Sequence, residues 1–136
     1  NISTIEQITE VSAQTDSYLN SMEIIGYKAH ALSIDSRIKE YHENSLNFQN
    51  STSEQVRRIA VESQIPTEKF ERWLLDAQQK NDLSLNSYNK ANIQISKINN
   101  INSYAKLQIE YVNAKQYTKE SLRYLLEILR NLKIKQ

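Results

Sequence analysis

The amino-acid sequence predicts an all-α protein, a single antiparallel up-and-down bundle of four helices whose first helix is very long. Only one of its 136 residues is glycine and only one is proline. The chain therefore lacks the turn-forming residues that sheets and loop-rich enzymes need. Apolar residues recur at steps of three and four along most of the chain, and no stretch alternates as a half-buried strand does. The length fits one domain, residues 1–136.

The first helix is expected at about residues 3–48. Its apolar positions step like those of a coiled-coil seam, at Ile5, Ile8, Val11, Thr15, Tyr18, Met22, Ile25, Ala29 and Leu32. A second series follows, displaced by two positions, at Ile34, Ile38, Tyr41, Ser45 and Phe48. The displacement indicates that the helix changes its packing face part of the way along. Gly26 inside this helix costs about 1 kcal/mol relative to alanine.

Polar clusters predict three corners. The first is expected near residue 50, because Ser51 and Glu54 have the spacing of a helix-capping box. The others are expected at residues 81–84 and 99–103. Pro66 either begins a new helix or kinks one that continues to about residue 80. Helices at 3–48, 52–80, 83–99 and 102–135, rising ~1.5 Å per residue, bring the two termini level. A closed bundle therefore favours the kink.

Composition excludes several classes of function. The 17 basic and 16 acidic residues leave almost no net charge, so we expect no nucleic-acid partner. There is no cysteine and there are only two histidines, so we expect neither a metal site nor a cofactor. The residues suggest no catalytic triad and no E-x-x-H pair, so we expect no enzymatic activity. No run of about 18 apolar residues predicts a membrane span, and no signal peptide is present.

The segment "EYHEN" places a histidine among carboxylates. Glu40, His42 and Glu43 do not converge on a helix, because neighbours along the chain point about 100° apart. We interpret His42 as a surface histidine near a helix C-terminus, with a proton-sensing role as the alternative. His30 is expected at the edge of the first seam.

Two pairs of residues are the candidates for ligand binding. Arg37 stands near Tyr41, and Arg72 is next to Trp73. The guanidinium group offers a rigid fork for a carboxylate or phosphate, and the aromatic rings offer a stacking face. The alternative is that the two aromatic residues lie at the edge of the core while the arginines pair with nearby carboxylates.

The last helix carries more apolar residues than one core needs. Eight of the thirteen residues from 122 to 134 are apolar, compared with about three in seven on a one-sided bundle helix. We therefore expect a weak homodimer in which Leu122, Leu126 and Ile128 contact the first helix of the partner. A neighbouring membrane or an adjoining helix would be alternative explanations.

Two segments carry a resemblance to a known family. Residues 35–63, "DSRIKEYHENSLNFQNSTSEQVRRIAVES", resemble the first hairpin of the four-helix-bundle ligand-binding domains of bacterial chemoreceptors and sensor kinases. Arg37, Glu40, Tyr41 and Phe48 occupy comparable places. Residues 110–129, "EYVNAKQYTKESLRYLLEIL", resemble the last helix of such a domain. The resemblance implies signal transduction by a periplasmic or extracytoplasmic sensor domain at the inner membrane. It also implies membrane spans outside this chain, and a small-molecule or protein signal.

A second class is also similar. Residues 113–136, "NAKQYTKESLRYLLEILRNLKIKQ", look like the leucine-dense tails of periplasmic minor-pilus proteins in type IV secretion and conjugation systems. That resemblance implies a structural component with no small-molecule site. Because the chain begins at Asn1 and not with Met, a signal peptide or a span could lie outside it. Spans on both sides would indicate the sensor, and a cleavable signal alone would indicate the secretion component.

Overall fold

The structure, a computed structural model, describes residues 2–135 as three long helices packed against one another. They are α1 (Ile2–Ser63), α2 (Glu68–Gln94) and α3 (Ile101–Lys135), with a short 3-10 turn, η1 (Ile95–Lys97), after α2. No strand occurs in this part of the chain. The predicted all-α class is confirmed, whereas the described residues form three long helices where four were expected. At 62 residues, α1 is even longer than predicted.

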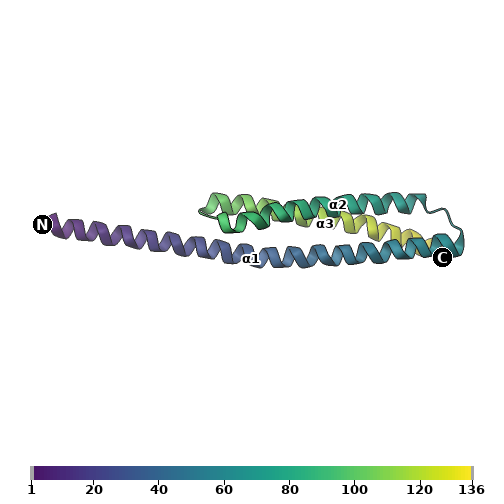
Figure 1. The fold of residues 1–136 in the computed structure, drawn as a ribbon, viewed down its shortest axis with the longest axis horizontal. Coiled ribbons are helices and arrows are strands. Elements are labelled where there is room, and N and C mark those ends of the chain that lie inside the picture. The colour runs from purple at the N-terminus through teal and green to yellow at the C-terminus, as the bar shows by residue number, and fades with distance from the viewer. Residues whose placement is uncertain (1, 136) are drawn as a thin grey trace.

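The helices differ greatly in length, and this decides the shape. Figure 1 shows α2 running back along the later part of α1, and α3 reversing once more beside α2. The early part of α1 extends beyond the bundle with no other helix beside it (Figure 1). The start of α1 and the end of α3 therefore lie at opposite ends of the molecule (Figure 1). The prediction of level termini is wrong, because it required a corner near residue 50.

No corner forms near residue 50, because the polar residues there serve the helix. The hydroxyl of Thr52 donates to the carbonyl oxygen of Phe48 at 2.8 Å, a bond that satisfies a buried hydroxyl inside a continuous helix. Glu54 forms no capping box and instead pairs with Arg57 at 2.7 Å. The first connection lies at residues 64–67, where Gln64 adopts a left-handed φ of 51°. Pro66 lies inside this connection, so it neither kinks nor begins a helix.

The predicted corner at residues 81–84 is also absent, since α2 continues through it. The corner expected at 99–103 overlaps the observed connection, which comprises residues 98–100. There the side chain of Asn100 accepts a hydrogen bond from the backbone N–H of Ser103 at 2.8 Å. This bond caps the start of α3. Clusters of polar residues therefore predicted this connection correctly, but the corners that they predicted near residue 50 and at residues 81–84 do not form.

Two apolar clusters form the core, with polar side chains between them. The cluster nearer the α2–α3 connection contains Ala31, Ile38, Ala91, Ile95, Ile98, Leu107, Tyr111 and Ala114. The cluster nearer the α1–α2 connection contains Val56, Phe70, Ala77, Leu125, Ile128 and Leu132. Between them, Asn81 accepts a hydrogen bond from Ser45 at 3.0 Å and donates to Gln49 at 2.5 Å. Ser84 and Thr118 also share a hydrogen bond at 2.7 Å.

The two apolar series of α1 differ in their exposure to solvent. In the second series Ile38 and Ser45 are buried, and Ile34, Tyr41 and Phe48 are half-buried against the bundle, as expected. The first series faces solvent, and every side chain from 3 to 23 is exposed. We call residues 3–26 the overhang. No helix within residues 2–135 has both the length and the apolar composition needed to cross a membrane.

Candidate functional site

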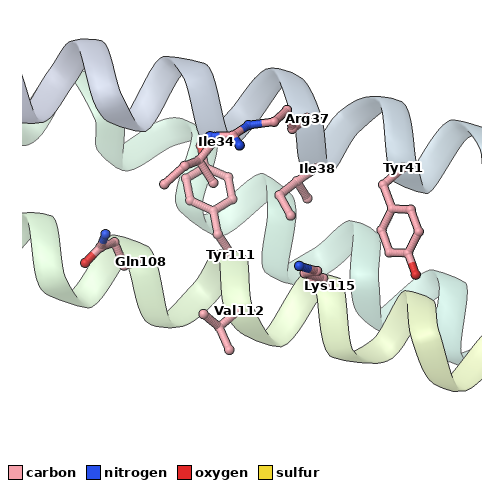
Figure 2. Close-up of a pocket in the computed structure, with 8 residues that line it drawn as sticks. All are labelled: Ile34, Arg37, Ile38, Tyr41, Gln108, Tyr111, Val112 and Lys115. Carbon is pink, nitrogen blue, oxygen red and sulfur yellow. The ribbon is translucent and has the colours of Figure 1, made fainter.

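A groove between α1 and α3 is the best candidate site among the described residues. It has a volume of about 550 Å³ and lies open to solvent along the bundle. Four residues from each helix line it: Ile34, Arg37, Ile38 and Tyr41 from α1, and Gln108, Tyr111, Val112 and Lys115 from α3. Figure 2 shows the Tyr111 ring rising from α3 toward α1 and the Tyr41 ring pointing from α1 toward α3. The structure therefore brings Arg37 and Tyr41 to one groove.

The groove carries positive charge and no negative charge. Arg37 and Lys115 are its only charged lining residues, and both are exposed. Neither forms an ion pair with a carboxylate of residues 3–133. The alternative that Arg37 pairs with the neighbouring Glu40 is therefore not seen in this structure. Two free cations above an apolar wall suit an anion that carries an apolar body.

A buried carboxylate supports the wall of the groove from behind. Asp35 accepts hydrogen bonds from the hydroxyls of Tyr111 at 2.5 Å and Tyr88 at 2.9 Å, and from the Asn92 amide at 3.0 Å. Burial, followed by the hydrogen bond to Asp35, raises the pKa of Tyr88 to about 12. The same causes raise the pKa of the Tyr111 hydroxyl well above its ordinary value. The network joins all three helices and fixes the Tyr111 ring that lines the groove.

The histidine of "EYHEN" is not at the surface, so that interpretation is wrong. His42 is buried, and it does not lie near a helix C-terminus, because α1 continues for 21 residues beyond it. Burial lowers the pKa of His42, although the charges of Glu43 and Asp82 oppose the shift. Its Nδ1 atom has no hydrogen-bond partner among the described residues. His30 is exposed, and one of its ring nitrogens contacts the Tyr104 hydroxyl.

The second candidate pair is not part of this groove. Arg72 is exposed on α2, whereas Trp73 is half-buried against the cluster near the α1–α2 connection. The Trp73 ring lies near Phe70, with 6.2 Å between the ring centroids, and the Lys69 ammonium group lies 4.6 Å from the Trp73 ring centroid. These contacts fit the alternative prediction, in which Trp73 sits at the edge of the core.

The apolar surplus of the last helix is used mainly inside the bundle. Ile128 is fully buried, Leu122 is half-buried and only Leu126 is exposed. α3 packs against both α1 and α2, so it needs two apolar faces where a peripheral helix needs one. Ile128 is therefore unavailable for the predicted dimer interface. Ile134, the last residue of the leucine-dense segment, lies outside the residues whose side chains the structure describes.

Sequence reasoning missed half of the groove. Gln108 and Lys115 come from α3, about 75 residues away from their neighbours on α1. No local pattern relates the two helices, because their register depends on the length of the connections between them. The buried Asp35 was also missed, although an acidic residue between the apolar Ile34 and Ile38 was a possible signal. Among residues 3–133 no group of histidines and carboxylates could hold a metal ion.

Comparisons with known proteins identify no relative. No protein-family model, no curated protein sequence and no solved structure matches this chain.

Proposed function

We propose that this chain is an extracytoplasmic signal-sensing domain of a bacterial transmembrane receptor, and that its signal is an anion with an apolar body. The observation that carries the proposal is the α1–α3 groove with its two free cations, Arg37 and Lys115. The resemblance of residues 35–63 to a sensor hairpin supports the same function. Organic acids and amino acids have the required chemistry, since each joins a carboxylate to a carbon skeleton.

The groove is also suited to passing a signal along the molecule. Its two walls belong to different helices, so a ligand that contacts Arg37 and Lys115 together pulls on both α1 and α3. Shifts of about 1–2 Å between packed helices are an established way to transmit a signal. A shift of α3 relative to α1 would reach whatever follows α3 in the receptor.

Thermal shift assays with organic acids, amino acids and amines test this proposal. A ligand that binds only the folded chain stabilises it by about 2.7 kcal/mol at 100 times its Kd. We expect anionic compounds to raise the melting temperature and simple amines to have no effect. Arg37→Ala and Lys115→Ala should each abolish the shift.

Arg58→Ala is the matched control, since Arg58 is an exposed arginine of α1 outside the groove. It should respond to ligand as the unmodified chain does. Flat melting curves with every compound would overturn direct sensing of a small molecule. An equal loss of response in the Arg58 variant would show that net charge, and not the groove, attracts the anion.

The second candidate function is a periplasmic structural component of a type IV secretion or conjugation system. The exposed apolar series of the overhang favours it, because such a surface suits assembly with other proteins. Sequencing the gene on both sides of this chain separates the two candidates. Hydrophobic spans on both sides support the receptor, and a cleavable signal without a second span supports the secretion component.

A further inference from the structure

The overhang exposes a regular apolar seam that no part of residues 2–135 covers. We define the seam as Ile8, Val11, Thr15, Tyr18, Met22, Ile25, Ala29 and Leu32, so it covers most of the overhang and the first turns beyond it. Its steps alternate strictly between three and four residues. The five large aliphatic residues and Tyr18 are each more than half exposed to solvent. An isolated helix in water gains no stability from such a pattern. Helices in proteins are stabilised mainly by packing an apolar face against a partner, and this repeat is the one that coiled coils pack.

Within the overhang, the residues that border this seam are uncharged. In heptad terms the seam occupies positions a and d, and the flanking e and g positions of the overhang hold Ile5, Gln7, Ser12, Gln14, Leu19, Ser21 and Gly26. Beyond the overhang, Lys28 occupies a g position and Ser33 the e position that it would face in a parallel pair. The four acidic residues, Glu6, Glu10, Asp16 and Glu23, all lie at the outer positions b, c and f. A second copy can therefore meet the seam without bringing like charges together at e and g.

The same charges argue against a membrane surface as the occupant. Residues 1–27 contain four acidic side chains and no lysine or arginine. Helices that lie on membranes carry basic residues on the polar face, and anionic lipids attract those residues. An acidic helix would be repelled.

A partner on the seam leaves the α1–α3 groove open. Tyr41, a groove residue, lies nine positions beyond Leu32, which is about two and a half turns at 3.6 residues per turn. The two side chains therefore point to opposite sides of α1. Dimerisation and ligand binding would use different faces of the same helix.

We propose that the seam pairs with the seam of a second copy as a parallel two-stranded coiled coil. In the parallel arrangement each seam residue meets its own counterpart, as a two-fold axis along the helices requires. The apolar seam ends at Leu32, because Ser36, Lys39 and Glu43 occupy the next three core positions, and Leu46, which is exposed, occupies the d position after them. An antiparallel pairing of the two seams would place Leu46 beyond the end of the partner's helix, so only the parallel pairing covers it. This inference does not depend on the proposed sensing function.

Sedimentation over a wide concentration range tests for the dimer. We expect the unmodified 136-residue chain to dimerise, and the double variant Tyr18→Glu, Ile25→Glu to raise the dimer dissociation constant on the order of 100-fold, because buried unpaired charges are costly. Ala13→Glu, Asn20→Glu is the matched control. It adds the same charge to the same overhang at outward f positions, and it should still dimerise.

The unfolding temperature of the dissociated bundle should be the same in all three proteins, because positions 13, 18, 20 and 25 are exposed on the overhang. This measurement separates a loss of dimerisation from a loss of folding. An unmodified chain that stays monomeric at every concentration would overturn the proposal. Sedimentation of that monomer with phosphatidylglycerol vesicles would do the same and would assign the seam to a membrane.

Cysteine cross-linking tests the orientation, and the chain offers a clean background because it has no cysteine. Val11→Cys should form a disulfide with its own counterpart in a parallel dimer, whereas Ala13→Cys, at an f position, should not. A mixture of Val11→Cys and Ala29→Cys chains cross-links between the two variants only in an antiparallel dimer. That second result, without the first, would overturn the parallel pairing.

Discussion

The two parts of α1 share one helix and one kind of apolar spacing, yet they have opposite environments. Ile25, in the overhang, is 66% exposed, whereas Ile38, in the bundle, is 8% exposed. Both belong to series that step by three and four residues. The difference arises from length: at ~1.5 Å per residue, the 62 residues of α1 extend about 93 Å and the 35 residues of α3 about 52 Å. The comparison teaches that an apolar series predicts a face that needs a partner, but not where the partner comes from.

Replacing one isoleucine in each part of α1 by alanine should produce the largest difference in the free energy of unfolding. We expect Ile38→Ala to lower the free energy of unfolding by about 2–5 kcal/mol, because it opens a cavity among packed side chains. Ile25→Ala should change it by less than about 0.5 kcal/mol, as at other exposed sites. Urea denaturation at a protein concentration low enough to exclude dimers measures both. Equal effects would mean that the overhang packs against its own bundle.

The same comparison between a buried and an exposed position can be made for asparagine, a residue type that is common in loops. Asn81 is buried and hydrogen-bonded to Ser45 and Gln49, whereas Asn89 is exposed on the same helix. We expect Asn81→Ala to cost about 1–3 kcal/mol, because buried polar groups lose their partner. Asn89→Ala should have little effect on urea denaturation. An Asn81→Ala variant with unchanged stability would contradict a structural role for the polar side chains between the two core clusters.

Gly26 marks the boundary between the two parts and should respond in the opposite direction. A Cβ atom added at Gly26 meets nothing within 4 Å. Alanine should therefore stabilise α1 locally by about 0.5–1 kcal/mol through helix propensity alone. Hydrogen exchange of the amides around residue 26 should slow, while exchange in the core cluster nearer the α1–α2 connection should stay the same. Faster exchange would show that the site is crowded and not open.

The smallest expected effect is a pH dependence that originates in the bundle part of α1. Burial lowers the pKa of His42 below its ordinary value of 6.5, so the unfolded chain binds the proton more readily than the folded chain. The free energy of unfolding should be at its full value above pH 6.5 and fall as the pH drops from 6.5 toward the lowered pKa. Chemical denaturation at a series of pH values measures this slope.

The variant His42→Leu should remove the His42 contribution to the slope, whereas His30→Gln, at an exposed position, should leave it in place. A slope unchanged by His42→Leu would assign the pH dependence to other groups. Because Nδ1 of His42 has no partner among the described residues, the leucine variant should not lose stability at neutral pH.

Part of the candidate site was predictable from the sequence. Arg37 and Tyr41 lie four residues apart on one helix, so their shared face follows from helical geometry alone. Lys115, Gln108 and the Asp35 network depend on how α3 and α2 align with α1, and no local signal encodes that alignment. Arg72 and Trp73 show the converse, since neighbouring residues of suitable chemistry ended in different environments.

The sequence by itself determined that the protein is helical, because scarce glycine and proline and the three- and four-residue apolar steps permit little else. It also determined where α1 changes its face, between Leu32 and Ile34. Only the tertiary structure decided where the helices end. Thr52 and Asn81 are turn formers in isolation, but inside the bundle their side chains find hydrogen-bond partners that keep α1 and α2 unbroken. Burial removes the preference of such a residue for turns. A polar side chain that is hydrogen-bonded inside the bundle no longer competes for the backbone hydrogen bonds of its own helix, so the helix continues.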